Sequence, residues 1–130
     1  MDMKIERVHH LAIICSDYER SKRFYTEVLG CKIEQEVYRE KRQSYKLDQS
    51  LNGQYVIELF SFPSPPARPS YPEATGLRHI AFAVRDLDEW MDYLQSKGVK
   101  AEPIRIDEFT DKKFTFFSDP DDLPIELYEL

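Results

Sequence analysis

Two short strings decide the fold of this sequence: HLAIICSD at residues 10–17 and HIAFAVRD at residues 79–86. Each begins with a histidine, continues with an aliphatic residue, an alanine and apolar residues, and reaches an aspartate seven positions after the histidine. The string IEL also occurs twice, at 57–59 and 125–127, and its copies are 68 positions apart, against 69 for the histidines. Because unrelated apolar strings would not keep this spacing, we interpret the chain as two copies of one module.

Prolines separate the two copies. Five of the eight prolines lie between residues 63 and 72, where neither a helix interior nor a central strand tolerates them. The stretch at 63–75 is therefore predicted to be an extended linker. It divides the chain into a first module at 5–62 and a second at 76–130, which together form one domain.

Each module has the pattern of a strand, a helix and three further strands. In the first module Ser16 or Asp17 can cap the helix and Gly30 can end it, and in the second module Asp86 and Gly98 have these roles. Apolar and β-branched runs predict strands at 7–14, 32–37, 44–48, 54–60, 77–84, 101–106, 113–117 and 124–129. The sequence thus predicts an α+β fold of two paired βαβββ modules that form a curved mixed β-sheet.

Polar residues interrupt these apolar runs at matching positions. His10 and His79 lie at the first strands, and an alanine two residues after each leaves room above the sheet. Glu58 and Glu126 lie inside the last strands, where a carboxylate is costly to bury unless it is paired or bound to a metal. For any one of these residues a structural role is the simpler interpretation. Four of them at repeat-related positions favour a divalent metal site inside the curved sheet.

The composition excludes several other classes of protein. The chain has 18 Lys and Arg against 24 Asp and Glu, a formal net charge of −6, which argues against nucleic acid as its main partner. No apolar run approaches the roughly 20 residues that span a bilayer, and the first residues lack the layout of a signal peptide. We therefore expect a cytoplasmic protein without a membrane partner. Cys15 and Cys31 are expected to be reduced structural thiols.

The repeated strings, together with the DPD motif at 119–121, resemble the vicinal oxygen chelate superfamily of glyoxalases, bleomycin-resistance proteins and dioxygenases. The likeness extends from about residue 5 to residue 130. Glyoxalase I holds its metal with one His and one Glu from each module, and the matching positions here are His10, Glu58, His79 and Glu126. The resemblance implies one mononuclear ion, zinc or nickel, with cobalt, manganese or iron as alternatives. It also implies a homodimer, whose sites draw modules from one chain or from both.

The resemblance further implies a glyoxalase-like lyase or isomerase, similar to lactoylglutathione lyase. A small α-hydroxycarbonyl compound or thiohemiacetal would chelate the ion through adjacent oxygens, and Glu126 would take the proton beside the carbonyl. Glu58 could act from the opposite face. Ile14 and Phe62 occupy the positions where glyoxalase I binds glutathione through an arginine and an asparagine, so the thiol partner stays open.

Other members of the superfamily are alternatives. A metal-free binding protein of bleomycin-resistance type has no need of the four ligands. Ring-cleaving dioxygenases and thiol transferases of fosfomycin-resistance type use two His and one Glu, so Glu58 counts against them. An anionic substrate could be held by one of four basic residues: Arg39, Lys41, Arg42 or Arg78.

Overall fold

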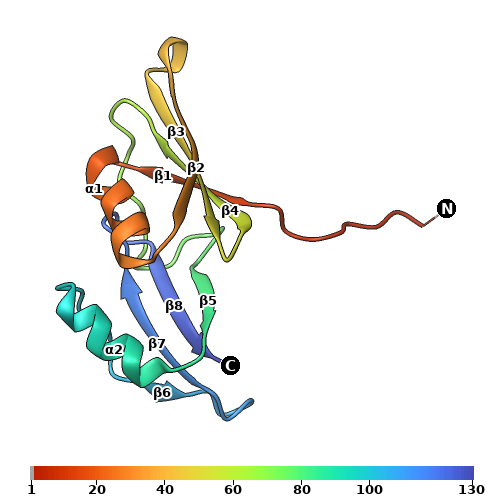
Figure 1. The fold of residues 1–130 in the computed structure, drawn as a ribbon, viewed down its shortest axis with the longest axis vertical. Helices are drawn as coiled ribbons and strands as arrows, with labels where there is room; N and C mark the ends of the chain where they lie inside the picture. Colours follow the sequence, from red (N-terminus) through yellow and green to blue (C-terminus); the bar gives the residue numbers. More distant parts are fainter. Residues whose placement is uncertain (1) are drawn as a thin grey trace. The chain divides into compact units, whose positions relative to one another are not determined.

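The structure is a computed structural model that describes residues 2–130 and divides into two compact units, Met1–Pro66 and Ala67–Leu130. Each unit contains one four-stranded mixed sheet and a helical segment in the order βαβββ (Figure 1). The α+β fold of two βαβββ modules expected from the repeat is confirmed. The chain divides within the proline-rich stretch, while the exact module boundaries stay a prediction.

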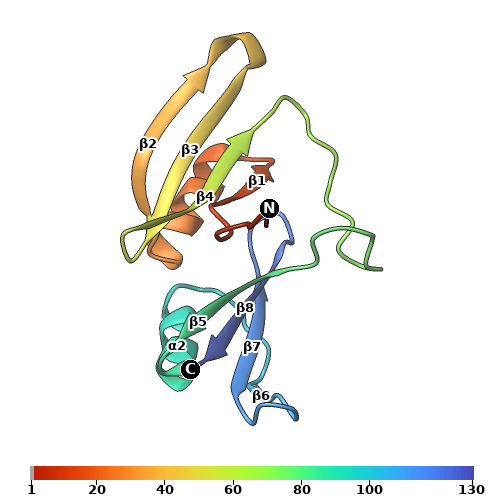
Figure 2. The same ribbon diagram turned by 90° about the vertical axis from the view of Figure 1, so that its right-hand side faces the viewer.

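The sheet of the first unit has the strand order β1-β4-β3-β2, with β1 parallel to β4 and the other neighbours antiparallel. After β1 the chain forms an α-helix that continues directly as one π-helical turn. A short 3-10 helix connects β2 to β3 at the end of the hairpin (Figure 2). The bounds are β1 (Leu11–Cys15), α1 (Tyr18–Arg23), η1 (Phe24–Val28), β2 (Lys32–Arg39), η2 (Glu40–Arg42), β3 (Ser44–Leu51) and β4 (Gln54–Ser61).

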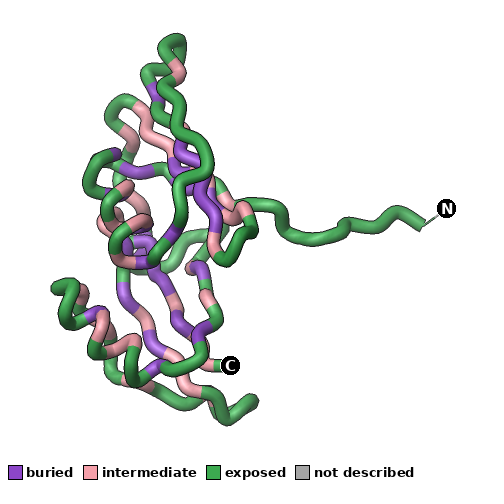
Figure 3. The backbone as a smooth tube through the Cα atoms, viewed as in Figure 1, coloured by how far each residue is buried: buried purple, intermediate pink, exposed green. Residues whose placement is uncertain are grey.

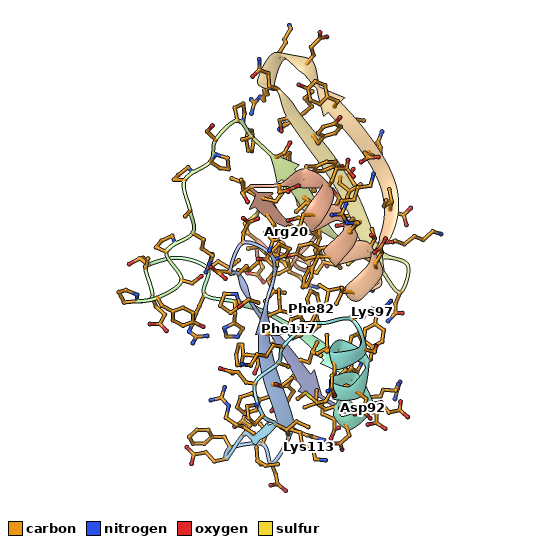
Figure 4. All side chains as sticks on the ribbon, turned by 90° about the vertical axis from the view of Figure 1, so that its left-hand side faces the viewer. Arg20, Phe82, Asp92, Lys97, Lys113 and Phe117 are labelled. Carbon is orange, nitrogen blue, oxygen red and sulfur yellow. The ribbon has the colours of Figure 1, made fainter. Side chains whose placement is uncertain are left out.

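The second unit repeats this arrangement with the strand order β5-β8-β7-β6, and β5 runs parallel to β8. Its elements are β5 (Ile80–Val84), α2 (Leu87–Ser96), β6 (Arg105–Ile106), β7 (Lys113–Ser118) and β8 (Pro124–Glu129). Figure 4 shows the side chains of this unit, including Asp92 on α2 and Lys113 at the start of β7. No helix within residues 2–130 combines the length and the apolar character needed to cross a membrane.

Buried residues alternate with less buried ones along several strands, as the colours of the tube in Figure 3 show. In the first unit Ile13, Leu59 and Leu47 are direct neighbours across three strands, and all are buried. The alternate residues Ala12 and Ile14 point to the opposite face and are exposed. The first sheet therefore has an apolar face with buried residues and an opposite, more exposed face, here called the open face.

Capping explains where both helices begin. The side chains of Asp17 and Asp86 accept hydrogen bonds from backbone N–H groups three residues later, at 3.2 and 3.1 Å. Such a cap contributes about 1 kcal/mol of stability. The sequence left Ser16 and Asp17 open as the first cap, and the structure assigns the cap to Asp17.

Three elements differ from the expected bounds. Strand β1 begins at Leu11 rather than residue 7, because its ladder with β4 starts at the pair Leu11–Ile57. The strand expected at 101–106 is reduced to Arg105–Ile106, since Pro103 lacks the N–H group that would continue the ladder. Residues 62–79 contain neither helix nor strand, as their prolines predict (Figure 2).

Candidate metal centre

The first unit brings His10 and Glu58 together on the open face of its sheet. Glu58 pairs with Ala12 across β4 and β1, and His10 precedes Ala12 by two residues. The His10 Nε2 atom lies 2.9 Å from Oε2 of Glu58, and the two side chains are 36% and 13% exposed. The imidazole and the carboxylate therefore form a close, partly shielded pair.

Three further polar side chains surround Glu58. Its Oε2 accepts a hydrogen bond of 2.5 Å from the Tyr55 hydroxyl, and its Oε1 lies 4.0 Å from Nζ of Lys46. Lys46 also donates to Asp48 at 2.7 Å, and Asp48 is the direct neighbour of Glu58 on β3. Burial, followed by the hydrogen bonds and charges of Glu58 and Asp48, raises the pKa of Tyr55 above its usual range. The phenol thus stays a hydrogen-bond donor that fixes Glu58.

The second unit places His79 and Glu126 in the same relation. Glu126 is the neighbour of Ala81 across β8 and β5, and the His79 Nε2 atom lies 3.3 Å from its Oε1. The Phe116 ring meets the His79 ring edge-on, with centroids 5.0 Å apart. The guanidinium of Arg78 donates to Nδ1 of His79 at 3.0 Å. Within residues 2–130, no other polar side chain contacts Glu126.

Each His–Glu pair has the spacing of two ligands of one metal ion. Bonds of about 2.1 Å that meet at 90 to 109° place their ligand atoms about 3.0 to 3.4 Å apart. The observed separations of 2.9 and 3.3 Å are close to this range. Imidazole and carboxylate ligands suit zinc, nickel, cobalt, manganese and iron alike. The described residues contain no group of three or more His, Cys, Asp or Glu side chains that could hold an ion. The joining of the two pairs at one ion therefore stays a prediction.

Sequence reasoning missed Tyr55 as a neighbour of Glu58. Simple alternation along a strand would place residues 55 and 58 on opposite faces. The pairing of β4 with β3 contains a bulge. The consecutive residues Gln49 and Ser50 pair with Ile57 and Tyr55, so one extra residue lies between the two partners on β4. The extra residue turns Tyr55 to the open face. No pattern in the sequence marks the bulge, so the tyrosine could not be assigned to the site.

His9 also lies beside the His10–Glu58 pair, although simple strand alternation would place it on the face opposite His10. Its Nδ1 lies 2.9 Å from Nδ1 of His10, and its ring lies 5.3 Å from that of Tyr55. Both histidines precede the start of β1, so strand alternation does not govern their side chains. The two cysteines are buried as expected, and burial raises the pKa of the Cys31 thiol to about 11.

Comparison with known proteins places this geometry in context. The uncharacterized protein YwkD of Bacillus subtilis is 62% identical over 127 residues, which cover 98% of this chain and 99% of YwkD. A crystal structure of a glyoxalase family protein from Enterococcus faecalis superposes with a TM-score of 0.90. It is 47% identical and covers 98% of this chain and 100% of that chain.

More distant relatives have named activities. The lactoylglutathione lyase of Schizosaccharomyces pombe is 30% identical over 97% of this chain and 48% of its own length. The metallothiol transferase FosB of Staphylococcus saprophyticus is 28% identical over 95% of this chain and 77% of its own. The fosfomycin resistance protein FosX of Listeria monocytogenes, in a mutant complex with Mn(II), shares the fold. Its TM-score is 0.74 at 20% identity, over 96% of this chain and 93% of FosX.

One family model matches residues 7–127 of the chain. That range includes both His–Glu pairs and all eight strands except the last residues of β8. The chain belongs to the Glyoxalase/Bleomycin resistance protein/Dioxygenase superfamily.

Proposed function

We propose that this protein is a metal-dependent, glyoxalase-like lyase or isomerase that acts on a small α-hydroxycarbonyl compound or a thiohemiacetal. The observation that carries the proposal is the distance within each of the two repeat-related His–Glu pairs, which suits two ligands of a metal ion. His10, Glu58, His79 and Glu126 would hold a single divalent ion, with modules contributed by one chain or by two copies of it. The homodimer and the cytoplasmic location stay predictions.

A bound zinc or nickel ion would supply Lewis acidity, which lowers the cost of negative charge on a substrate carbonyl oxygen. Glu126 takes the proton from the hydroxyl-bearing carbon beside that carbonyl and returns it to the former carbonyl carbon. The hydroxyl proton passes to the former carbonyl oxygen, so that the hydroxyl and carbonyl groups exchange places. The surroundings of Glu126 support this role, because His79 is the one side chain among residues 2–130 that forms an ion pair or a hydrogen bond with its carboxylate. Glu58 is tied by the Tyr55 hydroxyl and is better suited to a fixed ligand.

The experiment that tests this proposal is an activity screen of nickel- and zinc-loaded protein. Methylglyoxal is supplied together with several low-molecular-weight thiols, and formation of the hydroxyacyl thioester is followed. We expect conversion of at least one thiohemiacetal, loss of activity on chelation and recovery on addition of metal.

The same screen separates the alternatives within the superfamily. A protein that takes up no ion but binds small ligands would be a binding protein of bleomycin-resistance type. Metal-dependent addition of a thiol to a substrate, without proton transfer at carbon, would identify a thiol transferase. Either result would contradict the proposed lyase.

A further inference from the structure

Arg39 lies on the open face of the first sheet, over a pair of aromatic rings. We propose that Arg39, with Phe60, Phe62 and Ser44, forms a subsite for an oxyanion, the carboxylate or phosphoryl group of the substrate. A role of this subsite in substrate binding rests on the proposed function. Binding of an anion to the subsite can, however, be measured in protein without a metal.

The strand registers place Arg39 on the same face as the His10–Glu58 pair. Arg39 pairs with Ser44 across β2 and β3, and two residues further along β3 Lys46 pairs with Phe60. Phe60 follows Glu58 by two residues on β4 and so shares its face. At about 3.4 Å per residue, Phe60 lies about 7 Å along the strand from Glu58. The guanidinium is thus within the reach of a small substrate held at Glu58.

Aromatic rings hold the guanidinium in a fixed position. The Cζ atom of Arg39 lies 4.7 Å from the ring centroid of Phe60 and 5.7 Å from that of Phe62. The two rings are nearly parallel, with centroids 6.0 Å apart. Cation–π contact of this kind stabilises a partly buried charge without neutralising it. Arg39 is therefore oriented in advance for an anionic ligand.

The hydrogen-bonding capacity of Arg39 is largely unused. A guanidinium carries five N–H donors, and Arg39 donates one of them, from Nη2 to Ser44 Oγ at 2.8 Å. Its Nε is buried and has no acceptor within residues 2–130, and no carboxylate there forms an ion pair with it. A buried N–H group without an acceptor is costly, and an oxyanion that accepts from the guanidinium would offset that cost.

The other basic candidates lack this combination. Arg78 is engaged by His79 at 3.0 Å and by Glu73 at 3.6 Å. Lys41 and Arg42 are exposed in the turn between β2 and β3. Lys46 lies on the correct face but already contacts Asp48 and Glu58. Of the four residues suggested by the sequence, the structure favours Arg39.

Arg105 in the second unit provides a matched control. Its Cζ lies 5.0 Å from the Phe114 centroid and 5.9 Å from that of Phe116, a setting close to that of Arg39. Arg105, however, forms an ion pair with Glu102 at 3.0 Å, so its charge is already compensated. An Arg39-specific effect therefore separates anion binding from the general loss of a ring-stacked arginine.

The first experiment measures anion binding by metal-free protein. Inorganic phosphate and acetate are titrated into 15N-labelled protein, and the backbone amide resonances of Ser44, Phe60 and Phe62, which are present in every variant, are followed. We expect a saturable shift with at least one anion, and the anion that binds more tightly identifies a phosphoryl or a carboxylate ligand. R39M should weaken binding by about tenfold or more, while R105M should not. R39K keeps the positive charge but loses the planar guanidinium that can donate two parallel hydrogen bonds, so its affinity should be intermediate.

Two outcomes would overturn the subsite. One is the absence of any saturable response to either anion in the wild-type protein. The other is an equal loss of binding in R39M and R105M, both checked for folding by thermal denaturation. Neither outcome depends on metal uptake, so failure of the subsite is distinguishable from failure of the proposed lyase.

A second experiment links the subsite to the metal-loaded protein. Phosphoglycolohydroxamate and acetohydroxamate carry the same metal-chelating group, but only the former carries a phosphate. We expect the phosphate-bearing ligand to bind about tenfold more tightly, and R39M to remove that advantage. Equal preferences in the wild-type protein and R39M would show that Arg39 does not serve the substrate site.

Discussion

The two His–Glu pairs occupy the same positions of a repeated module, yet their surroundings differ. Glu58 accepts a hydrogen bond from Tyr55 and lies near Lys46 and Asp48, whereas Glu126 has His79 as its polar partner among the described side chains. The imidazole neighbours differ too, since His10 meets His9 and His79 meets Arg78. The two modules thus share the same histidine and glutamate, while the side chains around each pair differ. More side chains therefore hold the carboxylate of the first module than that of the second.

The largest expected effect comes from replacing Glu126, the proposed base. E126Q should lower the rate of substrate proton exchange by at least about 100-fold, because the amide cannot act as a base. E58Q serves as the matched variant. Its rate of proton exchange, divided by its metal content, should fall less than that of E126Q. Proton exchange is followed by deuterium incorporation from heavy water, with metal content measured on the same samples. Full exchange by E126Q would remove Glu126 as the base.

Loss of either histidine tests whether the two pairs act together. H10A and H79A should each weaken metal binding by more than about 100-fold. Loss of a residue that only hydrogen-bonds to a metal ligand already costs about 10- to 100-fold in affinity, and loss of a ligand itself should cost more. Competition with a coloured chelator measures the affinities. A variant at the neighbouring histidine, H9A, should change the affinity less. If either H10A or H79A keeps its affinity, the two pairs are not ligands of one ion.

A smaller effect is expected at the residue that restrains Glu58. Y55F removes the hydroxyl that donates to Glu58 and should weaken metal binding by about tenfold, as other partners of metal ligands do. Y128F removes a hydroxyl that donates to Asp107 at 3.1 Å and should leave the affinity unchanged. Unchanged affinity in Y55F as well would mean that the asymmetry between the two carboxylates has no bearing on the metal.

The smallest effect concerns a turn in which the modules differ in residue type. Before its last strand the first module has Gly53 at φ 77°, while the second has Asp122 at φ 66°. Since the left-handed conformation costs most residues roughly 1–2 kcal/mol, D122G should raise the free energy of unfolding by about 1 kcal/mol. G53A should lower it by a similar amount. Denaturant unfolding measures both, and a destabilised D122G would show that the Asp122 side chain has a role of its own.

Much of the fold could be predicted because the repeat constrains each element twice. The glycine ends of both helices, the aspartate cap of the second helix and the pairing of each histidine with a glutamate were readable, whereas either Ser16 or Asp17 could cap the first helix. The surroundings were not, because they depend on long-range register. The bulge that turns Tyr55 toward Glu58 and the cross-strand placement of Arg39 over Phe60 arise from pairing between strands. No local pattern encodes either of them.

Metal stoichiometry tests the central claim most directly. The protein is stripped with a chelator, reloaded with nickel or zinc, freed of excess ion and analysed for metal per chain. The account predicts about one ion per chain, because the four proposed ligands of one chain supply one site, and near-complete loss of that ion in both H10A and H79A. A reloaded wild-type protein that retains no ion, or a variant that retains its ion in full, would contradict it.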